Sequence, residues 1–508
     1  MVLIFLGLIY VTTKKLAEPD TPIQATVFGE KLLGDQLIED NSMGLSTDKP
    51  DPAATETQFS PTDLPPVNDP LALPPVIANL TLHGGSMAFS GADRPADVPI
   101  GLALRGRERG MKKSLLAQYG GNATTEDAVH LALEWLKKNQ RSNGAWSLNG
   151  PYPDGGEAEN HIAATAMALL AFQGAGNTHL YNGDSKYDYK PVVRKGWDAL
   201  IKMQSSDGQF VETGMFAPHT IYSHAQATIA LCELVGMTND SGYRHAAQKA
   251  IDFLVKSQDP AGGGWRYQPG FDSDTSVTGW VVMAMQSAIM AKLEVPKSTL
   301  QNITRYLDSA QGDGGSHYYY QPGRQPSPAM TAEGLLCRQY LGWAHDDPRL
   351  LAGADYISTQ PIGSDPNVYY WYYATQVMHH MGGDYWKHWN EVMRQVIPET
   401  QTKKGSEAGS WDPSGDRWGQ GGRLYVTCLR TYMLEVYYRH LPIYTNVYSQ
   451  KAESGSDAIL KMESGAKPNS DSADASKSET LEKSDAGGLD SMKSKSGETS
   501  KTGAEEAK

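Results

Sequence analysis

The chain has 508 residues, with 45 Lys and Arg against 58 Asp and Glu, and therefore a formal charge of −13. A general nucleic-acid-binding protein presents a basic face, so this balance argues against nucleic acid as a partner. The three cysteines lie far apart and without CxxC spacing, which is the signature of neither a disulfide framework nor a zinc finger.

Residues 1–13 form an apolar run that is shorter than the roughly 20 residues of a membrane-spanning helix. Two interpretations are open: a partial membrane anchor, or a short hydrophobic N-terminus without function. We favour the anchor and so expect a membrane-associated protein. The side of the membrane is left open.

Residues 14–118 are rich in Pro, Asp and Thr, a composition that cannot bury a core and predicts a mostly disordered linker. Residues 447–508 are mainly Ser, Lys, Asp, Glu, Gly and Ala, which predicts a disordered charged tail. The folded domain is therefore expected at 119–446.

A repeat runs through this domain. Six amphipathic helical patterns each end in Gln, with spacings of 41 to 64 residues, at Gln140, Gln204, Gln258, Gln311, Gln360 and Gln401. Several of these residues are followed by glycine and an aromatic residue, as in QRSNGAW at 140–146 and QDPAGGGW at 258–265. A regular period of this length predicts a repeat architecture.

After each Gln comes a second helical pattern that is rich in small residues and nearly uncharged, such as HIAATAMALLAFQGAG at 161–176. A helix that is apolar all round is buried on all sides. Closing six pairs into a ring buries the second set inside the first. We therefore predict an all-α fold, an α6/α6 toroid, with an open linear solenoid as the alternative.

The Q-x-x-x-G-x-W turn at 140–146 and its looser copies resemble the repeat of the terpenoid cyclase and protein prenyltransferase superfamily, which includes the squalene-hopene cyclases. The resemblance covers about residues 120–445. It implies an α-toroid with a central cavity for a hydrophobic, isoprenoid-type ligand. It is much less specific for the reaction, because function depends on the site and not on the fold.

Asp272-Ser273-Asp274-Thr275 resembles a shortened form of the Asp-x-Asp-Asp-Thr motif of squalene-hopene cyclases, whose middle acid protonates an alkene. Two registers are open: either Asp274 takes the acid position with Asp272 as its helper, or Ser273 does and the acid is lost. Burial and a neighbouring carboxylate would both raise the pKa of such an acid. The other interpretation of Asp274 is the N-cap of the helix that follows, and the two roles are compatible.

Further candidates lie at the predicted N-terminal ends of the inner helices, where we expect them to face one rim of the cavity. The substrate-binding candidates are His161, Tyr222, His224, Glu333, Tyr370, Trp371, Tyr373, Arg423 and Tyr425. Aromatic faces stabilise cations by roughly 0.5–2 kcal/mol each. Core packing, buried structural histidines and an ion pair of Arg423 with a glutamate are the alternatives.

Asp274-Thr275-Ser276 also resembles the Asp-x-Cys segment of the prenyltransferase zinc site, with Ser276 in the place of the thiolate. A serine hydroxyl is a poor zinc ligand, so we expect neither a metal nor a cofactor.

The first functional hypothesis is an isoprenoid cyclase that acts by protonation at Asp274. The alternatives are a non-catalytic binding or scaffold toroid of the cell envelope and a polysaccharide-active toroid enzyme. Whether the protein is an enzyme is left open by the sequence.

Overall fold

The computed structural model describes residues 104, 106–212, 219–363 and 365–444. The predicted anchor at 1–13, the tail at 447–508 and nearly all of the predicted linker lie outside these ranges. Of the described helices, none is both long enough and apolar enough to cross a membrane.

The described residues hold thirteen α-helices: α5 (Arg109–Gln118), followed by six pairs. The outer helices are α6 (Ala123–Lys138), α8 (Lys190–Ile201), α10 (Ser241–Lys256), α12 (Lys297–Ser309), α14 (Pro348–Ser358) and α16 (Gly383–Glu399). The inner helices are α7 (His161–Gly174), α9 (Thr220–Thr238), α11 (Thr275–Met290), α13 (Pro328–Tyr340), α15 (Val368–Met381) and α17 (Gly422–Arg439). Short elements complete the described part: β1 (Gln311–Gly312) pairs antiparallel with β2 (His317–Tyr318) around η2 (Asp313–Gly315), and η3 (Gly419–Gly421) precedes α17.

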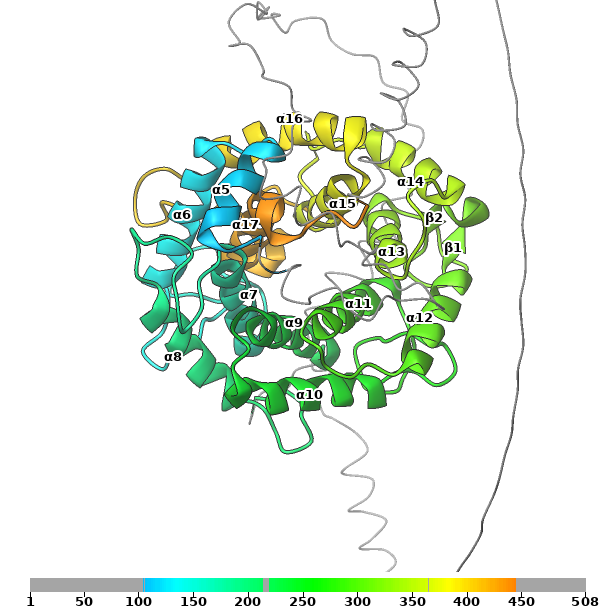
Figure 1. Cartoon of the computed structure of the whole chain (residues 1–508), viewed down its shortest axis with the longest axis horizontal. Helices are drawn as coiled ribbons and strands as arrows, with labels where there is room; N and C mark the ends of the chain where they lie inside the picture. Colours follow the sequence, from blue (N-terminus) through cyan, green and yellow to red (C-terminus); the bar gives the residue numbers. More distant parts are fainter. Residues whose placement is uncertain (1–103, 105, 213–218, 364, 445–508) are drawn as a thin grey trace, which may run out of the picture. The chain divides into compact units, whose positions relative to one another are not determined.

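The helix pairs close into two concentric rings (Figure 1). Each inner helix packs against the next, and α17 returns to α7, while α16 returns to α6 in the outer ring. The predicted α6/α6 toroid is confirmed, and the open solenoid is wrong because the last pair packs against the first.

The two rings differ in burial as the sequence patterns predict. Every residue of α15 is buried, as is the whole of α11 from Thr275 to Ala288. The outer helix α12 instead buries only one face, through Thr299, Ile303, Tyr306 and Leu307. Apolar burial of this kind contributes about 25 cal/mol per Å², so the nearly uncharged inner helices are stable only inside a closed ring.

In four of the six repeats, the glutamine that begins the turn joins two repeats. The side-chain amide of Gln258 donates to the carbonyl of Gly263 in its own turn (2.8 Å) and to that of Thr299 at the start of the next outer helix (3.1 Å). The equivalent pairs of bonds are made by Gln140, Gln204 and Gln401. Gln401 closes the circle, because its second acceptor is the carbonyl of Ala128 in the first repeat.

The glycine of the same turn is required by a close approach. Gly263 has φ +90°, and a Cβ built there would lie 2.5 Å from the carbonyl oxygen of Asn302 on α12. The corresponding turn glycines, Gly144, Gly208 and Gly409, share the positive φ and the same conflict with a backbone carbonyl. Glycine therefore lets each turn contact the backbone of the neighbouring outer helix.

We expect Gly263→Ala to lower the melting temperature in calorimetry more than Gly270→Ala does. Both positions have positive φ, which costs an alanine about 1–2 kcal/mol. A Cβ added at Gly270 (φ +69°) would meet no atom within 4 Å, whereas one added at Gly263 would meet the backbone of α12. Equal losses in the two variants would show that the close approach does not hold the ring together.

Candidate functional site

A narrow pocket lies at the N-terminal ends of the inner helices, and we call it the N-terminal pocket. Its aromatic wall consists of Tyr222, Trp280, Tyr369, Trp418 and Tyr425. Its polar side chains are Asn160, His219, Ser223 and Gln226, and the remaining lining is Leu148, Ala163, Met167 and Gly421. The described lining thus contains no carboxylate, and two of the predicted residues, Tyr222 and Tyr425, belong to it.

A chain of hydroxyl groups leads from this pocket to a buried acid. The phenol of Tyr222 on α9 donates to Ser276 Oγ on α11 (2.8 Å), and Ser276 Oγ contacts the phenol of Tyr369 on α15. The Tyr369 phenol donates to Glu333 Oε2 on α13 (2.9 Å). Four neighbouring inner helices therefore connect Glu333 to two phenols of the pocket wall.

Glu333 sits in an apolar environment. The side chain is fully buried and packs so closely against Gly279 of α11 that a Cβ there would collide with Glu333 Oε1. Among the described residues, none forms an ion pair with it. Burial raises its pKa well above the usual value. Burial thus favours the neutral, protonated form of the Glu333 carboxyl beside Tyr369.

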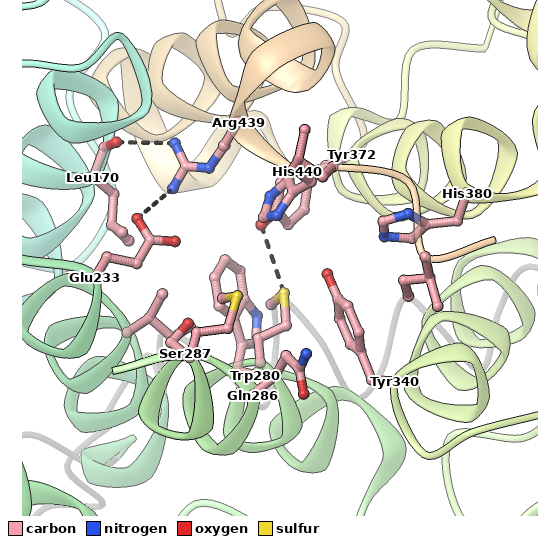
Figure 2. A pocket seen from close by; sticks show the side chains of 15 residues that line it. Leu170, Glu233, Trp280, Gln286, Ser287, Tyr340, Tyr372, His380, Arg439 and His440 are labelled. Atoms are coloured by element: carbon pink, nitrogen blue, oxygen red, sulfur yellow. Dashed lines mark hydrogen bonds and ion pairs between the residues drawn. The ribbon is translucent and has the colours of Figure 1, made fainter. Parts of the chain in front are cut away.

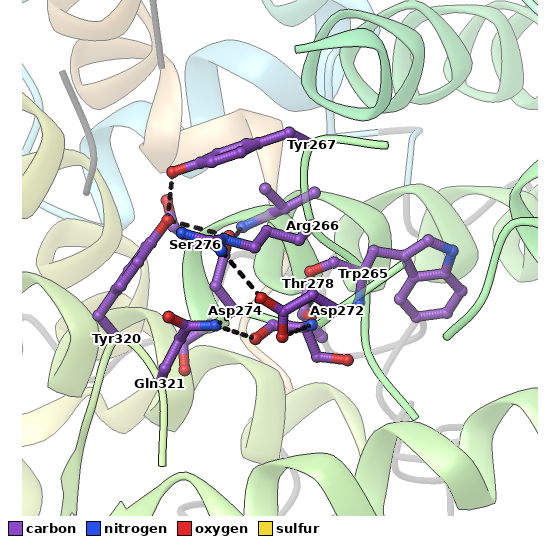
Figure 3. Close-up of polar contacts among 12 residues, drawn as sticks. Trp265, Arg266, Tyr267, Asp272, Asp274, Ser276, Thr278, Tyr320 and Gln321 are labelled. Atoms are coloured by element: carbon purple, nitrogen blue, oxygen red, sulfur yellow. Dashed lines mark hydrogen bonds and ion pairs between the residues drawn. The ribbon is translucent and has the colours of Figure 1, made fainter. Parts of the chain in front are cut away.

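Asp274 is the N-cap of α11. Its side chain accepts from the backbone N–H of Val277 (2.7 Å) and from the phenol of Tyr320 (3.0 Å), and Arg266 Nε lies 3.4 Å away (Figure 3). Burial raises the pKa of Asp274 to about 7, against the opposing effects of these partners. The capping interpretation is confirmed, and the carboxyl does not line the pocket.

Asp272 lies farther out, and its side chain is 38% exposed. The residue adopts φ +60°, and its carboxylate accepts from Arg266 (2.8 Å) and from the amide of Gln321 (3.1 Å). The structure thus brings the two predicted acids together around Arg266 (Figure 3). Neither acid belongs to the lining of the N-terminal pocket.

A second route connects Asp274 to the pocket through aromatic rings. Its partner Tyr320 contacts the phenol of Tyr267, whose ring stands edge-on to that of His219 at 4.4 Å. His219 is buried, and both its ring nitrogens lack a hydrogen-bond partner among the described residues. Burial lowers the pKa of His219 to about 3, so the pocket contains a neutral imidazole.

The two predicted histidines lie elsewhere. His161 begins α7, and its Nδ1 lies 2.7 Å from Glu212 on the rim. His224 accepts from the backbone N–H of Phe210 (3.1 Å) and donates to the carbonyl of Ala250 (3.0 Å), between α9 and α10. Burial lowers the pKa of His224 to about 4, which matches a neutral ring with both nitrogens satisfied.

The consecutive aromatic residues of α15 point in different directions. Tyr370 faces the outer ring, where its phenol donates to the carbonyl of Gln360 (2.8 Å). Trp371 packs beneath the guanidinium of Arg430, whose carbon lies 5.7 Å from the ring centre. Tyr373 packs edge-on against Tyr369 at 5.0 Å. Of residues 369–373, only Tyr369 is part of the pocket wall.

Arg423 is engaged at the edge of the ring. Its guanidinium pairs with Asp154 (2.6 Å) and donates to Ser410 Oγ (3.0 Å). The alternative of an ion pair with a glutamate is therefore wrong, because Arg423 pairs with Asp154 and so joins the first repeat to the last.

Sequence reasoning did not assign His219, Gln226, Trp280 and Trp418 to the site. His219 immediately precedes α9, and Trp418 lies in the loop before α17, so the helix starts were the available signal. Trp280 and Gln226 are within uniformly buried helices. In such helices no change of polarity marks the face that lines a cavity.

No family model and no curated protein matches this chain. Similar solved structures include the type II terpene cyclase MstE from Scytonema, with 13% identity, 62% of this chain and 97% of that chain covered, and a TM-score of 0.42. They also include the GH76A α-1,6-mannanase from Salegentibacter sp. HEL1_6, with 13% identity, 61% and 98% coverage, and a TM-score of 0.44. At these scores the likeness carries no conclusion about activity, and the function has to be derived from the site.

Proposed function

We propose that the toroid binds a hydrophobic, isoprenoid-type chain in the N-terminal pocket and cyclises it after protonating an alkene. The observation that carries this proposal is the hydrogen bond between Tyr369 in the pocket wall and Glu333, a buried carboxyl group without an ion-pair partner among the described residues. An apolar pocket with few polar groups is the usual form of a small-molecule site.

In the reacting arrangement the hydrogen bond between the two side chains is reversed, so that a protonated Glu333 carboxyl donates to the Tyr369 oxygen. Initiation then transfers the Tyr369 hydroxyl proton to a carbon of the alkene, and the Tyr369 oxygen takes the proton of the Glu333 carboxyl. The products of this step are a carbocation and the Glu333 carboxylate. The cost of a carboxylate in this apolar position is offset by the new positive charge nearby. The faces of Trp280, Trp418 and Tyr425 contribute roughly 0.5–2 kcal/mol each to a cation within reach.

Termination requires a base that takes a proton from a carbon next to the cation. His219 fits this role because its ring is neutral, buried in the pocket wall and without a hydrogen-bond partner among the described residues. The depressed pKa of His219 is no obstacle, because a proton next to a carbocation is strongly acidic. The sequence of steps consumes one proton and releases one, so the product is an isomer of the substrate.

The alternatives make different demands on the site. Glycoside hydrolysis uses two carboxyl groups on either side of the scissile bond, and the described lining of the N-terminal pocket has none. Asp274 as the direct acid requires its carboxyl to leave the cap and Tyr320. A scaffold protein would need no buried acid hydrogen-bonded to a residue of the pocket wall. Incubation of the protein and its variants with polyprenes separates these functions.

Incubation of the protein with squalene or geranylgeraniol should give cyclic isomers detectable by gas chromatography with mass spectrometry. Glu333→Gln should lower turnover at least a hundredfold, because an amide keeps the shape of the side chain but has no acidic proton. A loss of this size is typical when an acid catalyst is removed. Asp274→Asn should retain turnover, since asparagine caps a helix as well as aspartate. Loss of turnover in Asp274→Asn alone would make Asp274 the acid, and no product from either polyprene would overturn the cyclase.

The stability that Asp274 contributes should fall as the pH rises from 4 to 7. The pKa of about 7 in the folded protein lies above the ordinary 3.8, so the folded state retains a proton that the unfolded state has released in this window. Denaturant unfolding of the wild type and Asp274→Asn at several pH values measures the difference. We expect the free energy of unfolding of the wild type, relative to that of Asp274→Asn, to decrease up to pH 7 and to stay constant above it.

A shift in favour of the wild type over the same range would contradict this sign. It would mean that the ion pair with Arg266 keeps Asp274 ionised in the folded protein.

A further inference from the structure

A second pocket lies at the opposite end of the ring, where the inner helices end, and we call it the C-terminal pocket (Figure 2). The segment after α17, including His440 and Ile443, forms one side of it. Trp280, near the middle of α11, lines this pocket as well as the N-terminal pocket. The indole thus lies between two sites with different surroundings.

The C-terminal pocket contains buried polar groups without partners. The side-chain oxygen of Gln286 and both ring nitrogens of His380 make no hydrogen bond to any described residue, although the two residues are only 4% and 1% exposed. Figure 2 shows them on two walls of the open space, with the Tyr340 phenol between them. A buried polar group left without a partner costs about 1–3 kcal/mol, which a ligand can recover.

The charged groups of this pocket are already paired. Glu233 accepts from Arg107 (2.7 Å) and lies 3.5 Å from Arg439. Arg439 also pairs with Glu435 (2.8 Å) and donates to the carbonyl of Leu170 (2.9 Å). The groups that are free to bind are therefore uncharged: an amide oxygen that accepts, and an imidazole that burial keeps neutral by lowering its pKa, so that it donates and accepts.

We propose that the C-terminal pocket is a second ligand site, which takes a neutral amphiphile with a hydroxyl head group. The hydroxyl hydrogen-bonds to the Gln286 amide. The apolar part of the ligand lies against Trp280, Met283 and Met290, which complete the wall. This site does not depend on the chemistry of the N-terminal pocket.

Geraniol, an apolar alcohol, is the probe, and the first experiment uses the unaltered full-length protein. Methionine methyl groups are labelled with carbon-13, and the signals of Met283, Met290 and Met167 are assigned with single Met→Leu variants. Met167 lines the N-terminal pocket and so reports on the other end. Shifts at Met283 and Met290 on addition of geraniol support the site. Shifts at Met167 alone, or at none of the three, overturn it.

The second experiment measures geraniol affinity from the Met283 and Met290 shifts, which report on the C-terminal pocket alone, in Gln286→Leu and in the matched Gln226→Leu, which removes a similarly buried amide from the N-terminal pocket. Gln286→Leu should weaken this binding about tenfold, the loss expected for one hydrogen bond, and Gln226→Leu should leave it unchanged, whatever its effect on the Met167 signal. The reverse pattern, or equal affinities, overturns the proposal.

Two further arms complete the test. Geranic acid and geranylamine carry the same chain with a charged head group. If either binds as tightly as geraniol, the proposal that the site takes a neutral head group is wrong. Ser287→Leu fills the pocket next to Gln286 and should abolish binding. This variant replaces Gln286→Leu in the test if Gln286→Leu does not fold. Unchanged binding in that variant would place the alcohol elsewhere.

Discussion

The need of the inner helices to be buried on every side is the constraint on which this structure depends. A helix such as α15, with all of its residues buried, has no face to present to water. Only a ring in which the last pair meets the first satisfies six such helices at once. Four of the turns support closure, because their glutamines and glycines tie each of these turns to the backbone of the next outer helix.

The same constraint gives the few acidic groups inside the ring their different properties. Asp274 is buried but accepts a backbone N–H, accepts a phenol and lies near Arg266, so its pKa rises only to about 7. Glu233 lies between two arginines, which lower its pKa despite full burial. Glu333 has only phenols and apolar neighbours, and burial raises its pKa well above the usual value. In one core, Asp274 is thus suited to capping, Glu233 to ion pairing and Glu333 to proton donation.

The interior of the ring also separates two kinds of binding chemistry. At the N-terminal ends of the inner helices, aromatic faces surround a chain of hydroxyl groups that ends at Glu333. At the C-terminal ends, ion pairs neutralise the charged residues and leave neutral groups such as Gln286 without a hydrogen-bond partner among the described residues. Trp280 belongs to both walls, so a ligand at one end affects a side chain that the other end uses.

The amino-acid sequence alone determined the double ring and the order of its helices, because these follow from periodicity. It offered the cap at Asp274 as one of two interpretations, because this residue precedes an apolar helix. Each outer helix ends two or three residues before its glutamine, as at Lys138 and Gln140. Only the tertiary structure decided that Glu333 meets Tyr369 and that His219 is left without a partner among the described residues. The physical reason is that a helix buried all round carries no polar face, so its rotation about its own axis is set by packing against its neighbours.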